Sequence, residues 1–224
     1  MRPIKMSNIL STRRHFVVSL ALGSAGLFAP GAFAEELIRT KSVEEGPFYP
    51  DQLPLDTDND LLIVNDALTP AVGDVAHLSG RLLDSKGDPI KNALIEIWQV
   101  DSMVVYLRDR PAHPGKFDSH FQGFGRFMTG STGEYYFRTI KPLPYELRPA
   151  PHVHFAVKVK GREKWTTQLF VKGFPGNEND KLYKSIRDPK ARDSVTVDFV
   201  PVKGSRVGEL SAKFDMIMGF TPEA

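Results

Sequence analysis

The sequence predicts a mainly β protein, an antiparallel β-sandwich with long loops and little helix. Three observations predict this fold class. Short apolar segments recur along the chain, 18 glycines and 17 prolines punctuate its 224 residues, and a single short stretch shows a helical pattern. Short strands separated by glycine- and proline-containing turns are typical of two sheets that bury one common core.

The first two strands are expected at 75–84 and 93–100. The second is apolar on both of its faces, which indicates a strand buried on both sides. Residues 35–74 are expected to be irregular because prolines and a polar stretch interrupt them. Residues 107–133 are expected to form a long loop because they contain seven glycines and prolines. The other elements are expected, in order, at 134–139, 152–160, 166–171, 179–186 (a short helix), 195–200 and 211–218.

Residues 1–34 have the organisation of a cleavable signal peptide. Four basic residues and no acidic residue precede Glu35, and Ala32-Phe33-Ala34 follows an apolar run of about 13 residues. The alternative is a membrane anchor, but a spanning helix needs about 20 apolar residues, and glycines interrupt this run. We expect a signal peptide at 1–34, one domain at 35–224 and no stable membrane span after cleavage.

The pair Arg13-Arg14 before Phe16 resembles the twin-arginine signal. That route exports proteins that are already folded. The resemblance therefore implies that the twin-arginine translocase is a partner during export and that any cofactor is inserted beforehand. It also implies a bacterial protein that is periplasmic or secreted.

Charge and cysteine content exclude several function classes. The formal charge is +2, but four of the 29 basic residues lie in the signal segment, which leaves 25 basic against 27 acidic residues in the domain. The domain lacks a basic stripe, so we expect no nucleic-acid partner. The absence of cysteine excludes disulfides, thiolate nucleophiles, cysteine-bound zinc and iron–sulfur clusters.

His152 and His154 lie two residues apart in a predicted strand. Residues i and i+2 of a strand point to the same face, so both imidazoles are expected on one side and the apolar residues between them on the other. Such a pair can simply be solvated, or it can offer two ligands to one metal ion. The spacing alone leaves both interpretations open.

Six motifs, the histidine pair among them, occur in one order along the chain. They are 45–50 (EGPFYP), 95–101 (IEIWQVD, leading to Tyr106), 123–129 (GFGRFMT), 139–145 (TIKPLPY), 152–154 (HVH) and 166–170 (TTQLF). Together they resemble the intradiol ring-cleavage dioxygenases, the catechol and protocatechuate dioxygenase family. The likeness covers most of the expected domain and is greatest to the compact, exported members.

The resemblance implies one ferric ion, Fe(3+), per chain on a β-sandwich whose long loops form the active site. Carried over residue by residue, the metal ligands are Tyr106, Tyr145, His152 and His154. The donor chemistry agrees, because phenolate is a hard anionic oxygen donor that favours Fe(III) and imidazole suits iron. The alternative for each tyrosine is a core or rim residue with a hydrogen-bonded hydroxyl.

The reaction implied by the resemblance cleaves a catecholic ring between its two hydroxylated carbons with O2, giving a muconate-type dicarboxylic acid. Tyr145 would be displaced by the substrate and accept a proton, Arg148 would stabilise negative charge on the ring, and Gln168 would line the pocket. Arg148 departs from the family pattern, since it lies four residues before His152 instead of three. With this extra residue, the sequence does not determine whether the Arg148 side chain contacts the substrate.

Other residues near the motifs receive no such role. His113 and His120 are alternative ligands in the predicted loop that the resemblance does not assign. Asp109 and Asp118 are expected to cap loops, and Trp98 is expected to lie in the core.

Two other functions remain open at this stage. One is a transthyretin-like sandwich that binds aromatic or carbohydrate ligands without turnover. The other is an enzyme with the same four ligands that acts on a hydroxyquinol or a lignin-derived catechol. The sequence specifies neither the ring substituents nor the oligomeric state.

Overall fold

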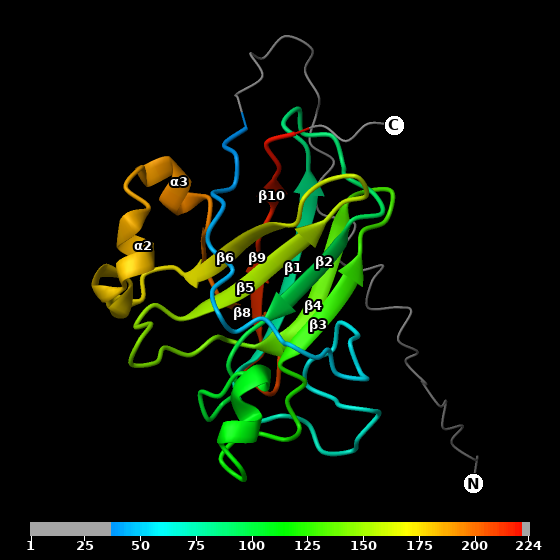
Figure 1. Ribbon diagram of the computed structural model, residues 1–224, viewed down its shortest axis with the longest axis vertical. Helices are drawn as coiled ribbons and strands as arrows, with labels where there is room; N and C mark the ends of the chain where they lie inside the picture. The colour runs from blue at the N-terminus through cyan, green and yellow to red at the C-terminus, as the bar shows by residue number, and fades with distance from the viewer. Residues whose placement is uncertain (1–36, 221–224) are drawn as a thin grey trace, which may run out of the picture. The chain divides into compact units, whose positions relative to one another are not determined.

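The computed structural model describes residues 37–220, in which two five-stranded sheets share one core (Figure 1). The first sheet contains β1 (Val75–Leu83), β4 (Glu134–Ile140), β8 (Val200–Pro201), β9 (Leu210–Lys213) and β10 (Met216–Ile217). The second contains, in spatial order, β3 (Phe124–Met128), β2 (Leu94–Trp98), β5 (His152–Lys158), β6 (Trp165–Val171) and β7 (Thr196–Val197). The predicted β-sandwich is confirmed.

Both sheets are mixed rather than purely antiparallel. The long pairs β1–β4, β2–β3, β2–β5 and β5–β6 are antiparallel. β9 and β10 pair with β1 in parallel, and β7 pairs with β6 in parallel. These parallel strands come late in the chain, and long connections separate them from the strands with which they pair. Hairpins, by contrast, connect only antiparallel neighbours.

The core lies between the sheets, and β5 shows how the sequence divides its two faces. Val153 and Phe155 pack in a cluster with Leu78 of β1 and Phe137 of β4, all with no exposed surface. Burying one such large apolar side chain contributes about 1.5–3 kcal/mol. The alternate residues of β5, among them the two histidines, therefore lie on the face that points away from this core.

The expectation of one long loop at 107–133 was wrong. The segment contains the 3-10 helix η1 (Leu107–Ala112) and the strand β3, which pairs with β2 along its whole length.

Residues 57–62, which we call the strap, bind the outer edges of both sheets. The Arg126 N–H of β3 donates to Thr57 O, and the Arg138 N–H of β4 donates to Asn59 O. The strap therefore covers part of the outer edge of β3.

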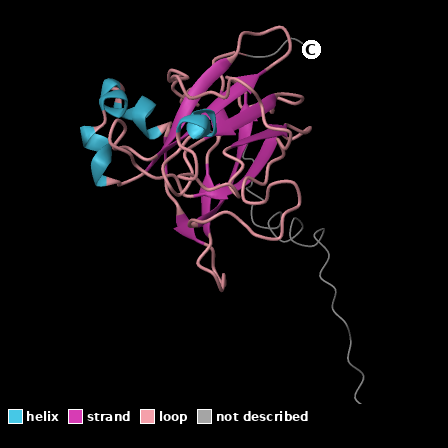
Figure 2. Ribbon diagram, turned by 60° about the horizontal axis from the view of Figure 1, so that its bottom comes forward, coloured by secondary structure: helices cyan, strands magenta, loops and turns pink. Residues whose placement is uncertain are grey.

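Helix is confined to short pieces outside the sheets (Figure 2). The expected helix at 179–186 is present as α2 (Lys181–Ser185), preceded by the 3-10 helix η2 (Pro175–Asn179) and followed by α3 (Pro189–Asp193). α2 and α3 lie together at one side of the sandwich, near β6 (Figure 1). Their apolar residues pack on Phe170 of β6.

The expected strand at 195–200 is divided into β7 and β8, and the one at 211–218 into β9 and β10. No helix within residues 37–220 is both long and apolar enough to cross a membrane. The predicted signal peptide at 1–34 lies outside the described residues, so this assignment stays a prediction.

Candidate metal centre

Four side chains from three separate segments converge on the outer face of the second sheet. The Oη of Tyr106 lies 3.0 Å from Nε2 of His154, 3.2 Å from Nε2 of His152 and 3.4 Å from Oη of Tyr145. Tyr106 and the two histidines are at most 3% exposed, whereas Tyr145 is half-buried. The structure thus brings all four predicted ligands together around one point.

The register of the sheet places the histidines. His154 lies opposite Gln168 of β6 and Trp98 of β2, so these side chains form one row across the outer face. The Trp98 ring stacks on the His154 ring with 4.9 Å between centroids and 10° between planes. The next residue of β5 on this face is Ala156, a small residue that leaves room for the neighbouring rings. Trp98 is buried, as expected, but in this outer cluster.

Tyr106 is presented by a short turn that Asp101 holds. The buried Asp101 carboxylate accepts hydrogen bonds from the N–H groups of Met103, Val105 and Asp118. Within the turn Val104 has a φ of 65°, which is unfavourable for a β-branched residue. Tyr106 follows directly, and the Phe48 ring of the EGPFYP motif stacks on it at 4.4 Å between centroids.

Tyr145 and Arg148 face each other across a tight turn. Each N–H donates to the other's carbonyl, at 3.0 and 2.9 Å. Directly opposed residues of an antiparallel bridge point to the same side, so the turn sends both side chains toward the cluster. The turn thus accommodates the extra residue before His152. Nη1 of Arg148 lies 3.5 Å from Nε2 of His152.

Two polar residues hold the guanidinium of Arg148. Nε donates to Oδ2 of Asp180 at 2.8 Å, and Nη2 donates to Oε1 of Gln168 at 2.9 Å. The Gln168 amide in turn donates to the carbonyl of Glu44, next to the segment that carries Phe48. The sequence did not predict a role for Asp180. Asp180 falls inside the helix expected at 179–186; the structure instead makes it the N-cap of α2, and nothing in the sequence pairs it with Arg148.

Burial makes the four candidate ligands neutral in the absence of a cation. Burial, and then the Arg148 cation, lower the pKa of His152 to about 3. Burial, and then the adjacent His152, lower the pKa of His154 well below its usual range. Burial raises the pKa of both tyrosines. A bound cation would lower the pKa of the two phenols, because it stabilises their deprotonated form.

The donor set fits a ferric ion. Nδ1 of His152 lies 2.7 Å from the Ala150 carbonyl, so this nitrogen carries the proton and the Nε2 lone pair points to the cluster. Two phenolates would supply the hard, anionic oxygen donors that Fe(III) prefers, and the two neutral imidazoles would supply nitrogen donors, which also suit iron. Among residues 37–220 no three histidine, cysteine, aspartate or glutamate side chains form a metal site, so this centre depends on its tyrosines.

The remaining candidates lie elsewhere. His113 is exposed and His120 is partly exposed, and neither contacts the cluster through a described bond. Asp118 accepts hydrogen bonds from the N–H groups of Val72 and His120, which agrees with a loop-capping acid.

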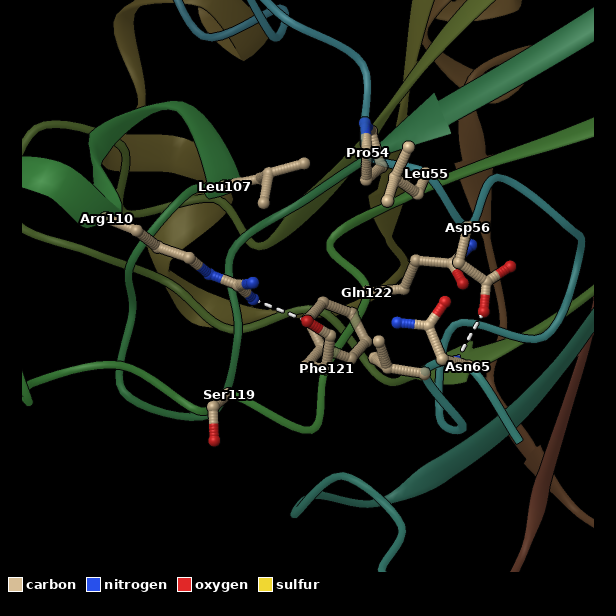
Figure 3. A pocket seen from close by; sticks show the side chains of 10 residues that line it. Pro54, Leu55, Asp56, Asn65, Leu107, Arg110, Ser119, Phe121 and Gln122 are labelled. Carbon is tan, nitrogen blue, oxygen red and sulfur yellow. Dashed lines mark hydrogen bonds between the residues drawn. The ribbon is translucent and has the colours of Figure 1, made fainter. Parts of the chain in front are cut away.

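A separate pocket of about 190 Å³ lies between Leu107 and Asn65 (Figure 3). Arg110 crosses it to bind the Phe121 carbonyl, and no candidate ligand lines it.

Comparisons with known proteins agree with this geometry. The family model described as Dioxygenase matches residues 44–217. The protocatechuate 3,4-dioxygenase beta chain of Burkholderia cepacia is 30% identical over 155 residues, which cover 66% of this chain and 65% of that protein. The catechol 1,2-dioxygenase of Candida albicans is 26% identical over 212 residues, covering 85% of this chain and 65% of that one. The chain therefore spans less than two thirds of the length of these relatives.

Solved structures show the same fold. The dioxygenase domain of a dioxygenase carbohydrate-binding protein fusion from Streptomyces sp. SirexAA-E has a TM-score of 0.62 at 24% identity, covering 82% of this chain and 99% of that one. The 3-chlorocatechol 1,2-dioxygenase of Rhodococcus opacus has a TM-score of 0.64 at 20% identity, covering 93% and 79%. With a family model that matches most of its length, the chain belongs to the intradiol ring-cleavage dioxygenase family.

Proposed function

We propose that this protein is an Fe(III)-dependent dioxygenase that cleaves a catecholic ring between its two hydroxylated carbons with O2. The product would be a muconate-type dicarboxylic acid. The convergence of two tyrosine oxygens and two histidine nitrogens, with Arg148 beside them, carries this proposal. One ferric ion per chain would be held by Tyr106, Tyr145, His152 and His154.

When bound, the ferric ion supplies Lewis acidity and accepts electron density from a catecholate. The residues of the chain contribute a proton acceptor. Tyr145 is the half-buried member of the set and sits on a turn, whereas Tyr106 is buried under Phe48. Tyr145 is therefore free to leave its place when a catechol binds, and its phenolate oxygen can take a catechol proton.

Arg148 and the aromatic walls complete the site. Nη1 is the part of the guanidinium that neither Asp180 nor Gln168 holds, and it points to the cluster. A preorganised cation there stabilises negative charge on an attacked ring. Phe48 and Leu143 pack against the cluster of Trp98 and Tyr106, and apolar surroundings strengthen the interaction between Nη1 and this charge.

Two measurements on protein purified from iron-replete cells test the proposal. Elemental analysis should give one iron per chain, with a visible absorption band from tyrosinate-to-Fe(III) charge transfer. Incubation with a panel of catechols and O2 should give ring-opened dicarboxylic acids. Aromatic binding without iron would instead support the transthyretin-like binding module, and iron with no product from any catechol would contradict the proposed ring cleavage.

We also propose that the protein acts outside the cytoplasm after twin-arginine export. The motif of residues 1–34 supports this, in particular Arg13-Arg14 followed by an apolar run. Export of a folded chain would allow iron to be inserted in the cytoplasm.

A further inference from the structure

Asp180 is a charged residue next to the candidate site with no exposed surface. Its two oxygens have different partners. Oδ1 accepts the N–H groups of Leu182 and Tyr183, at 3.0 and 2.9 Å, and so caps helix α2. Oδ2 accepts Nε of Arg148 at 2.8 Å. One carboxylate therefore joins the start of α2 to the arginine of the site.

Helix capping does not explain why this residue is charged. Asparagine and serine cap helices about as well as aspartate does, without the cost of burying a negative charge. The next helix offers a comparison, because Asp188 caps α3 by accepting the Lys190 N–H and is exposed. Asp180 differs from Asp188 in being buried and in what its Oδ2 accepts, which is Nε of Arg148 at 2.8 Å and, more weakly, the Ala150 N–H at 3.4 Å.

The ion pair determines the direction of the guanidinium. The group is planar and rigid, so fixing two of its nitrogens also fixes the third. Asp180 holds Nε and Gln168 holds Nη2, which leaves Nη1 directed at His152, 3.5 Å from its Nε2. Without the bond from Nε to Asp180, no carboxylate holds the guanidinium, and its orientation depends on the bond to the neutral Gln168 amide and on the weaker contacts with His152 and the Phe170 ring.

We infer that Asp180 is a positioning residue for the proposed ring cleavage: it orients Arg148 so that Nη1 faces the bound substrate. The inference rests on the proposed function of the site. Asp180 does not touch the substrate and acts only through the arginine.

The variant Asp180→Asn separates the two tasks of this residue. The asparagine Oδ1 can still accept the N–H groups at the start of α2, but its Nδ2 is a donor and cannot accept Nε of Arg148. We expect kcat per bound iron to fall about 10- to 100-fold, as for other misplaced catalytic groups, with little change in anaerobic catechol binding. Asp188→Asn, the same substitution at the cap of α3, should leave kcat unchanged.

A double-mutant cycle distinguishes positioning from general damage. If Asp180 acts through Arg148, then Asp180→Asn should lower kcat no further in an Arg148→Ala background. Equal losses in both backgrounds, or wild-type kcat in Asp180→Asn, would overturn the inference.

Crystal structures of the wild type and of Asp180→Asn give a readout that is independent of activity. The guanidinium should turn away from His152 in the variant while the cap of α2 stays in place; an unmoved guanidinium would contradict the inference. If no form of the protein cleaves a catechol, the proposed function fails, and these structures still decide whether Asp180 orients Arg148.

Discussion

His154 illustrates how burial sets the behaviour of single residues in this site. It is 1% exposed, lies under the Trp98 ring and directs Nε2 at Tyr106. No other histidine of the described chain except His152 is close enough to replace it. Burial lowers the pKa of this imidazole, which favours the neutral form that can donate a lone pair to a metal ion.

We therefore expect His154→Ala to lose iron. Removing a residue that merely orients a ligand weakens metal binding about 10- to 100-fold, so the loss of a ligand should be at least as large. Elemental analysis after dialysis measures the effect. His113→Ala, a substitution at an exposed histidine in the loop after η1, is the control and should keep its iron. Equal iron in both variants would show that His154 is not a ligand.

The two tyrosines should differ in the same assay. Tyr106→Phe removes the buried oxygen that contacts all three other groups, so iron should be lost. Tyr145→Phe should keep most of its iron but lower kcat by about 10²-fold or more, the usual loss for a missing acid–base group. Visible absorbance and product formation report the two effects. Full rate and unchanged colour in Tyr145→Phe would refute its assignment.

Asp180 also links stability to pH. Burial raises the pKa of its carboxyl, but the hydrogen bonds from Arg148 and the Tyr183 N–H outweigh this, and the net pKa lies below 3.8. A lowered carboxyl pKa stabilises the fold above the unfolded value and loses this contribution as the pH falls through the folded value. The stability gap between wild type and Asp180→Asn should be constant above about pH 5 and should narrow below pH 3.8. Urea unfolding across this range measures it.

Residue-level prediction from the sequence works where the signal is local. His152 and His154 can be placed on one face of β5 because side chains alternate along a strand. Both tyrosines lie in or shortly after recognisable motifs. The partner of Arg148 could not be predicted, because Asp180 is 32 residues away and reaches the arginine only through the packing of α2 on β6. The turn that brings Arg148 to the site was missed for a related reason, since it depends on the backbone bonds to Tyr145.

Among the elements, β3 shows why composition is a poor guide in a glycine-rich segment. Gly123 and Gly125 suggested a loop, yet Gly125 lies within a strand that pairs with β2 along its length. A Cβ at this position would lie 2.6 Å from Leu61 and 2.8 Å from the Asp58 carbonyl. The glycine is needed because the strap crosses the strand there, and that approach cannot be read from β3 alone.

Gly125→Ala should therefore destabilise the fold by about 1–3 kcal/mol, the usual range for overpacking a tight contact. Chemical denaturation gives the free energy of unfolding. Gly130→Ala is the matched control, because a Cβ at Gly130 meets nothing within 4 Å. If the two variants were equally stable, the strap would not lie against β3 as described.

For the whole molecule, the proposed location depends on residues 1–34. Arg13→Lys together with Arg14→Lys keeps the charge of the segment but removes the arginine pair that the twin-arginine route reads. We expect the double variant to accumulate in the cytoplasm as an uncleaved precursor with its iron bound. Cell fractionation and the mass of the protein test this. Normal delivery of the variant would point to the general secretion route instead.

The pairing of β1 with β9 and β10 has a consequence for the kinetics of folding. The Arg81 N–H next to this junction donates to the carboxylate of Asp215, 134 residues later. The central strand of the first sheet thus stays incomplete until nearly all of the described chain has been synthesised. Folds dominated by such distant contacts form slowly, on the millisecond to second scale. We therefore expect refolding of the iron-loaded protein from urea to recover the visible band no faster than β1 acquires its last partners.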